Sequence, residues 1–344
     1  MTGTWLPLRI GALRLRVEPK LLVRGVLLGA VCLILAGAAL NFGSYPVGVS
    51  DLAAALTGTL DRIDTLILLD VRLAHLAAAL FAGLALGSAG AIFQALLRNP
   101  LATPDIIGFT AGASCGAVAI ITLTGATAWM LGGAIAGGML AALATFALSI
   151  KDGLSIHRLV LVGIGVSFTL GAVTDFLLTR TDIMSAGDAS KWLAGSIDAR
   201  SWSELALPAG AITALLVLAL WLQYPLNRMQ LGDDLAIGLG IPVATIRILI
   251  SIVGIALTAL AVSIAGPLPF VAFIAGPIAK RIIGTSSAAI FSAGLVGAVL
   301  TIGSDLAARN ALGFVQLPTG VFTALVGAPY FLALLFFQSK RGKL

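Results

Sequence analysis

Long apolar runs, separated by short polar or glycine- and proline-rich stretches, occupy most of the chain between residues 23 and 338. A helix needs roughly 20 mostly apolar residues to cross the hydrocarbon of a bilayer, and some of these runs are long enough for two crossings. Glycine and proline end helices, and they divide two of the runs, at 124–126 and at 266–269. The pattern predicts ten membrane helices, near residues 23–42, 73–97, 105–124, 127–149, 157–180, 205–224, 246–265, 268–284, 286–308 and 318–338.

The amino-acid composition also indicates that the chain lies in a lipid bilayer. Of the 344 residues, 59% are hydrophobic and only 10% are charged, and the mean hydropathy is +1.07. A globular domain keeps about a quarter of its residues charged, so this chain is not expected to be soluble in water. We therefore predict an all-α polytopic membrane protein in which residues 1–344 form one transmembrane domain.

The distribution of basic residues predicts the orientation in the membrane. With ten spans, all but six of the 21 Lys and Arg residues fall on the side that holds both termini. The positive-inside rule then places both termini in the cytoplasm, with residues 1–22 as a basic segment and residues 339–344 as a tail. The first apolar run is too long for a secretory signal peptide, whose apolar region spans about 7–15 residues. The six basic residues expected outside are Arg62, Arg72, Arg180, Lys191, Arg200 and Arg309.

The sequence has no recognisable features of an enzyme. It contains no phosphate-binding Gly-x-x-x-x-Gly-Lys-Ser/Thr loop, and neither His75 nor His157 has metal-ligand neighbours at a suitable spacing. Cys32 and Cys115 both lie in predicted spans, so a disulfide framework is not indicated. We expect neither catalysis nor a bound cofactor or metal in this chain.

Charge inside the predicted spans is sparse. Asp175 and Asp305 lie toward the outer ends of their helices, and Arg309 follows Asp305 by one helical turn, which favours a local ion pair over a proton relay. Ion-coupled carriers usually hold ionisable groups at mid-depth, so an ion-driven transporter is disfavoured. Two helices carry small-residue stripes that permit close packing, at Gly83, Gly87 and Gly90 and at Gly132, Gly133, Gly137 and Gly138.

Two predicted cytoplasmic loops carry more structure than a turn requires. The first is RNPLATPDIIGF, residues 98–109. In it Pro100 ends one span, and Thr103-Pro104-Asp105 has the pattern of a helix start, with threonine capping and proline at the first position.

The second loop, LNRMQLGDDLAIGLGIPVATIR at 226–247, predicts two short helices outside the bilayer. Asp233 and Asp234 are expected to cap the first helix, Gly240 to end it, and Pro242 to start the second. The residues expected to face outward are small or apolar, and such a surface on a cytoplasmic loop indicates a protein partner. Because the chain has no energy source of its own, that partner is expected to supply force. The outward-facing set is Leu235, Ala236, Gly238, Leu239 and Gly240.

Five stretches resemble one known family in matching order over most of the chain. They are RLAHLAAALFAGLALGSAGAIFQALLRNPLATPDIIGFTAGA (72–113), LVLVGIGVS (159–167), LGDDLAIGLGIPVATIR (231–247), AGPLPFVAFIAGPIAKRIIG (265–284) and QLPTGVFTALVGAPYFLALL (316–335). The family is FecCD, the permease subunits of ABC importers for ferric siderophores, vitamin B12 and haem. RNPLATPD, LGDDLAIGLG and KWLAGSIDARSW most resemble the permeases of ferric enterobactin and related siderophores. The resemblance implies a vitamin B12 permease-like, type II importer fold.

The same resemblance implies a complex in the inner membrane. It consists of two permease subunits around a central path, two ATPase subunits that bind ATP and Mg²⁺, and a periplasmic or lipid-anchored substrate-binding protein. Similar siderophore systems often use two different permeases, which favours a heterodimer over a homodimer. Residues 226–246 become the coupling helices that contact the ATPase. The expected substrate is a ferric siderophore, with vitamin B12 or haem as the alternative, and no nucleic-acid partner is expected.

Transferred residue by residue, the family's docking positions for the binding protein fall on Arg72, His75 and Arg309. Many members have Arg-Leu-Pro-Arg where this chain has 72–75, so one docking charge is replaced here by an imidazole. Many also have Pro-His-Ile-Ala-Arg-Arg where this chain has 276–281, and the role of that histidine does not carry over to Pro277. Four hydroxyl side chains are candidates for the substrate path or for helix–helix hydrogen bonds, namely Thr169, Thr174, Thr319 and Thr323.

Two functions of other classes compete with this interpretation. A secondary transporter driven by an ion gradient would take up substrate without any ATPase. A membrane scaffold or enzyme would show no substrate flux with all partners present. The sparse intramembrane charge and the apolar cytoplasmic loop disfavour both.

Overall fold

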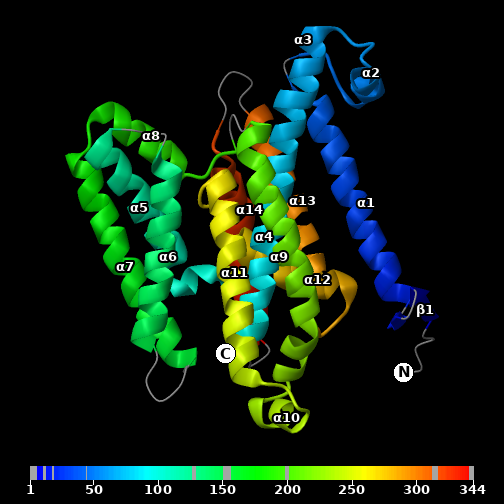
Figure 1. Ribbon diagram of the computed structural model, residues 1–344, viewed down its shortest axis with the longest axis vertical. Coiled ribbons are helices and arrows are strands. Elements are labelled where there is room, and N and C mark those ends of the chain that lie inside the picture. The colour runs from blue at the N-terminus through cyan, green and yellow to red at the C-terminus, as the bar shows by residue number, and fades with distance from the viewer. Residues whose placement is uncertain are drawn as a thin grey trace.

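The computed structural model describes residues 6–10, 13–17, 19–43, 45–125, 129–149, 156–197, 201–311 and 317–340. It is a bundle of helices preceded by a two-stranded antiparallel hairpin (Figure 1). The longer helices are α1 (Pro19–Asn41), α4 (Ala74–Leu96), α5 (Phe109–Thr124), α6 (Met130–Ser149), α7 (Ile156–Arg180), α9 (Trp202–Met229), α11 (Val243–Ala265), α12 (Val271–Ile283), α13 (Ile290–Asn310) and α14 (Thr319–Lys340). The shorter elements are β1 (Leu6–Ile10), β2 (Leu13–Val17), η1 (Val49–Asp51), α2 (Leu52–Thr57), α3 (Arg62–Thr65), η2 (Leu66–Leu73), η3 (Pro104–Ile107), α8 (Ile183–Leu193) and α10 (Asp233–Gly238).

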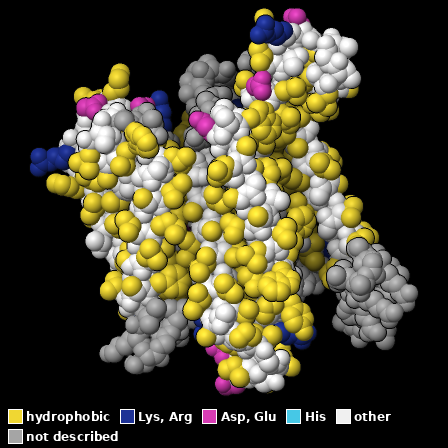
Figure 2. Space-filling model, in the orientation of Figure 1, with side chains coloured by type: hydrophobic (Ala, Val, Ile, Leu, Met, Phe, Trp, Pro, Cys, Tyr) yellow, Lys and Arg dark blue, Asp and Glu magenta, His cyan; other side chains and the backbone are white. Residues whose placement is uncertain are grey.

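Eight helices in the described part of the chain are long and apolar enough to cross a membrane. α5 is apolar but only 16 residues long, and α12 has 13 residues. In the space-filling view, apolar side chains cover the sides of the bundle, whereas Lys, Arg, Asp and Glu gather at its two ends (Figure 2). The surface therefore matches a bilayer around the sides and water at the ends, and the chain is a multi-pass membrane protein.

α4 is the central helix of the bundle. It packs against α11, α12 and α13, while α5, α6 and α7 form a group at one side and α1 lies at the other edge (Figure 1). α10 protrudes at one end of the bundle, and α2, α3 and α8 lie at the opposite end. β1 and the C-terminal mark lie toward the α10 end.

Glycine makes the close helix contacts possible. Gly83 and Gly87 of α4 face Gly297 of α13, and Gly90 faces the backbone of Ala272 in α12, so that an added Cβ at any of the three positions in α4 would collide with backbone atoms. The predicted stripe in α4 is therefore a packing surface. Its physical origin is that two helices can approach backbone to backbone only where neither has a side chain.

The stripe in α6 separates into packed and open positions, which makes a matched test of this packing. Gly137 faces the backbone of Gly112 and Gly116 in α5, whereas Gly132 in the same helix has open space around its Cβ position. We expect Gly137→Ala to destabilise the protein by about 1–3 kcal/mol through overpacking. Gly132→Ala is expected to be neutral or stabilising by up to about 1 kcal/mol, because alanine favours helix. Thermal unfolding of both variants in the same detergent measures the difference, and equal melting temperatures would contradict it.

The N-terminal hairpin was not predicted. Residues 1–22 were expected only as a basic segment, but β1 and β2 pair with Leu6 opposite Val17, Leu8 opposite Leu15 and Arg9 opposite Arg14. The alternation Leu-Arg-Leu-Arg-Val at 13–17 has the period of two that is typical of a strand. That signal was available in the sequence.

Helix continuity at the end opposite α10 was also missed. The span predicted at 73–97 is part of one helical stretch from Arg62 to Leu96 that includes the π-helical segment η2. Asp64 and Asp70 interrupt the apolar pattern there, although a helix outside the bilayer tolerates them. α8 was missed as well, although Asp182 is a recognisable N-cap: its carboxylate accepts hydrogen bonds from the backbone N–H groups of Met184 at 3.1 Å and Ser185 at 3.0 Å.

Candidate functional site

α10 presents apolar side chains to the outside at one end of the bundle. Leu235, Ile237 and Leu239 are 62%, 61% and 57% exposed. Gly238 has open space around it, and Gly240 adopts a left-handed conformation with φ of 78° that turns the chain toward α11. Exposed leucine and isoleucine on a short helix form a knob suited to a groove in another protein. We call Leu235, Ile237, Gly238 and Leu239 the α10 knob.

Three details of the predicted loop are corrected by the structure. Ala236 is fully buried and packs toward the bundle, so it does not belong to the outward-facing set, while Ile237 does. Only one short helix is present among the described residues of the segment, because the stretch after Pro242 is the first turn of α11. Asp233 makes no capping hydrogen bond, and Gly232 is the N-cap residue of α10. The exposed Asp234 follows Asp233 in the first turn of α10.

Asp233 instead bridges two arginines from distant parts of the chain. Its Oδ1 accepts a hydrogen bond from Arg98 at 2.5 Å, and its Oδ2 accepts one from Arg247 at 2.7 Å. Arg98 also donates to the backbone carbonyl of Met229, the last residue of α9, at 2.6 Å. The Arg247 hydrogen bond, followed by that of Arg98, lowers the pKa of Asp233 below its ordinary value. This clamp ties α10 to the loop after α4 and to the start of α11.

Loss of the clamp is expected to separate motion of α10 from motion of the bundle. In the complex that the family resemblance implies, we expect Asp233→Asn to retain ATP hydrolysis while substrate uptake falls several-fold. Because both ion pairs are partly exposed, we expect the change in stability to stay below about 1 kcal/mol. A double-mutant cycle with Arg98→Gln tests the pairing, since the combined loss should be smaller than the sum of the single losses. Additive losses would contradict it.

The pH dependence of the clamp follows from the lowered pKa of Asp233. The folded-state pKa of Asp233 is below its pKa in the unfolded chain. The contribution of its ion pairs to stability is therefore fully present above the unfolded value of about 3.9. It is lost only as the pH falls through the folded-state pKa. The link that Asp233 makes between α10 and the bundle is therefore expected to be independent of pH near neutrality.

Arg72 is buried, although it was predicted to dock a partner. Its guanidinium donates hydrogen bonds to the carbonyl oxygens of Leu40 and Tyr45, both at 2.7 Å, and to that of Val47. Only 8% of the residue is exposed. Three carbonyls at the end of α1 and in the following loop would lose their partner without it, so this side chain holds that loop in place rather than presenting a charge at the surface.

His75 and Arg309 converge on Asp305. The Nε2 of His75 lies 2.9 Å from one carboxylate oxygen of Asp305, and the Nε of Arg309 lies 3.0 Å from the other. Thr319 donates a hydrogen bond to the same carboxylate at 3.2 Å. The predicted local pair of Asp305 and Arg309 is confirmed, and it is part of a larger cluster that joins α4, α13 and α14. Both basic side chains retain a small exposed part.

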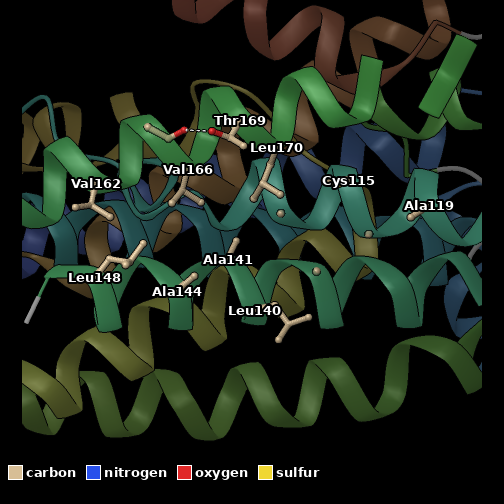
Figure 3. A pocket seen from close by; sticks show the side chains of 14 residues that line it. Cys115, Ala119, Leu140, Ala141, Ala144, Leu148, Val162, Val166, Thr169 and Leu170 are labelled. Atoms are coloured by element: carbon tan, nitrogen blue, oxygen red, sulfur yellow. Dashed lines mark hydrogen bonds between the residues drawn. The ribbon is translucent and has the colours of Figure 1, made fainter. Parts of the chain in front are cut away.

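The four threonines proposed for the path have internal hydrogen bonds. Thr169 and Thr174 donate to carbonyls one turn back in α7, Thr323 donates to Gly320, and Thr319 binds Asp305. Of the four, only Thr169 is exposed. Thr169 borders an apolar cavity of about 630 Å³ between α5, α6 and α7, which Cys115, Leu140 and Leu170 also line (Figure 3).

Comparison with known proteins identifies the family. The family model described as the FecCD transport family matches residues 29–337. The chain is a member of the FecCD family. This FecCD chain is 36% identical over 327 residues to the ferric enterobactin transport system permease protein FepG of Escherichia coli K12, covering 94% of this chain and 99% of FepG. It is also 36% identical over 326 residues to a siderophore transport system permease protein, YfhA of Bacillus subtilis, covering 90% of this chain and 93% of YfhA.

Solved structures share the fold of this FecCD chain. A metal-chelate type ABC transporter in an inward-facing conformation superposes with a TM-score of 0.81 at 26% identity, over 91% of this chain and 98% of the other. PsaBC of Streptococcus pneumoniae gives a TM-score of 0.54 at 21% identity and is a likeness of fold alone. The expected ABC permease fold is therefore confirmed for this FecCD protein.

Proposed function

We propose that this chain is the transmembrane permease subunit of an ABC importer that carries a ferric siderophore across the inner membrane by alternating access. The observation that carries the proposal is the apolar α10 knob, held by the Asp233 clamp, in a FecCD chain whose sequence contains no phosphate-binding loop. A transporter of this kind must receive force from a partner that hydrolyses ATP. The names of the relatives, which are siderophore permeases, support the substrate class.

The proposed complex has partners at both ends of the bundle. Two ATPase subunits contact the α10 knob, and a substrate-binding protein docks at the end formed by α2, α3 and α8. There the half-buried His75 and Arg309 are weaker docking candidates than their sequence positions suggested, because both engage Asp305. Exposed basic residues at that end, such as Arg62 and Lys191, extend the positive surface offered to acidic residues of the partner. A second permease subunit, different from this one, completes the proposed path.

Reconstitution tests the proposed function directly. The chain is placed in proteoliposomes with its second permease, ATPase and binding protein, and uptake of iron-labelled siderophore is measured with and without ATP. We expect ATP-dependent uptake of a ferric siderophore and none of haem or vitamin B12. Uptake of only haem or vitamin B12 would support the ABC mechanism but would show that the proposed siderophore substrate is wrong. Uptake by the chain without any ATPase, driven by an ion gradient, would reject the ABC mechanism.

A further inference from the structure

Two short helices begin inside the bundle and face a common cavity. At about 1.5 Å per residue, α5 and α12 are about 24 Å and 20 Å long, less than the roughly 30 Å of bilayer hydrocarbon. The later part of α5 packs on α8 through Val118 and Ile121, and the last residue of α12 bonds to Arg24 near the start of α1. The two helices therefore run to opposite ends of the bundle, and their first residues lie at intermediate depth.

The cavity at these helix starts has a volume of about 410 Å³. Leu86, the middle of α4, is one of its walls, which places it near the centre of the bundle. Its wall also includes Thr110 and Ser114 at the start of α5 and the residues of the break before α12. A smaller cavity of about 300 Å³ shares four residues with it and reaches α14. The shared residues are Asp105, Pro269, Phe270 and Phe273.

Among the described residues that border these two cavities, Asp105 is the only one with a charged side chain. Its residue is exposed to the cavity, and its carboxylate accepts a hydrogen bond from Thr110. A carboxylate at membrane depth is unfavourable unless it meets water, a partner or a functional demand. Among the described residues, no ion pair joins it to a basic group.

Aromatic side chains form another part of the wall. Phe273 makes edge-to-face contacts with Phe270 at 6.4 Å and with Phe331 of α14 at 5.1 Å between ring centroids. Phe270 adopts a left-handed backbone with φ of 64° directly before α12, an uncommon conformation for a bulky residue. It packs on Gly327 of α14. Such backbone strain occurs preferentially where function requires a defined shape.

The helix ends that border the cavity are expected to attract anions. The amino-terminal ends of α5 and α12 each carry partial positive charge, and paired half-helix starts at mid-depth are suited to hold anionic groups. Ferric catecholates are strongly anionic, because their phenolate oxygens carry more negative charge than Fe³⁺ neutralises. A chelate of that kind would be retained at the two helix starts. A carboxylate at Asp105 opposes this attraction.

We propose that Asp105 faces the translocation path and lowers its affinity for anionic ferric chelates, so that a chelate passes without being held. This inference rests on the proposed siderophore transport. It assigns to the carboxylate a role in specificity: it weakens retention of anionic chelates and has little effect on neutral ones, such as ferric tris-hydroxamates. The aromatic wall offers apolar surface to either class.

The test uses the complete reconstituted complex. Binding of labelled ferric catecholate and of a neutral ferric hydroxamate is measured at equilibrium without the binding protein, and single-turnover uptake is measured with it. We expect Asp105→Asn to retain the catecholate on the order of tenfold more tightly and to slow its uptake, because one like-charge repulsion is removed. Hydroxamate binding is expected to be unchanged. Asp105→Glu, which keeps the charge, is expected to behave as wild type.

Matched variants separate this effect from a structural one. Asp175→Asn removes an exposed carboxylate of α7 outside the two cavities. It is expected to change the binding and uptake of neither chelate. If Asp105→Asn does not accumulate, Ser114→Asp adds a carboxylate to the same cavity and is expected to weaken catecholate retention. Unchanged retention, or an equal shift for both chelates, would overturn the inference. Failure of the wild-type complex to import any ferric chelate would instead reject the proposed function.

Discussion

Glutamate in place of Leu239 is expected to abolish uptake while the permease still inserts and folds. Leu239 is 57% exposed on the α10 knob, so a charged side chain there meets water in the isolated subunit. In the proposed complex the same side chain would enter an apolar groove of the ATPase without a partner. Buried anchor residues of interfaces contribute about 2–4 kcal/mol, so we expect ATP-dependent uptake to fall on the order of a hundredfold.

The measurement compares uptake, ATP hydrolysis stimulated by loaded binding protein, and melting temperature in the same preparation. Leu239→Met keeps an apolar side chain of similar volume and is expected to retain most of the uptake. Lysine or glutamate at Gly238, which has open space around it, is expected to act like Leu239→Glu. Normal stimulated hydrolysis in Leu239→Glu would remove the knob from the ATPase interface.

Loss of the Asp305 carboxylate is expected to be the most destabilising single change at the end opposite α10. Asp305 is 3% exposed and serves His75, Arg309 and Thr319 from three helices. Removing one partner of a buried ion pair leaves the other charge uncompensated, at a cost of about 3–5 kcal/mol. We expect Asp305→Asn to lower the melting temperature strongly and to reduce accumulation in the membrane.

Asp175→Asn is again the matched control, because Asp175 is an exposed acid in α7. Its change in stability is expected to stay within about 0.5 kcal/mol. The cluster also decides how binding-protein docking should be tested. Charge reversal at Arg309 would set two carboxylates against each other, so Arg309→Gln is the cleaner variant for affinity measurements. Wild-type stability of Asp305→Asn would show that the cluster does not support the fold.

Most of the membrane helices could be predicted from local pattern, because burial in lipid requires long apolar runs whatever the neighbours are. Boundaries were less accurate where polar residues continue a helix beyond the bilayer, as between Arg62 and Leu73. The span predicted at 105–124 is a short 3-10 segment, η3, followed by α5, with Gly108 in a left-handed conformation between them. Local signals alone do not decide where one helix ends and the next begins at a glycine.

For the candidate site, the sequence indicated which segments carry polar side chains, but it did not predict most of the partners of those side chains. Asp233 has a sequence position typical of a helix cap. In the structure its carboxylate instead pairs with the charged side chains of Arg98 and Arg247. Arg72 was expected at the surface, yet it donates hydrogen bonds to three carbonyls at the end of α1 and in the loop after it. Asp105 was interpreted only as part of a helix start. Its place in a cavity depends on Phe270 and Phe273, more than 160 residues further along the chain.

Composition and local pattern were enough to predict the lipid environment and the family of this protein, and the printed sequence contains no phosphate-binding loop. These properties follow from composition and local pattern, since hydrocarbon demands apolar helices and family motifs are contiguous strings. Apart from the local pair of Asp305 and Arg309, the charge pairs became visible only in the tertiary structure. Asp233, Asp305 and Asp105 have similar intrinsic chemistry, and one forms a clamp, one a buried cluster and one the wall of a cavity, because the packing of distant helices sets which partners lie within reach of each carboxylate.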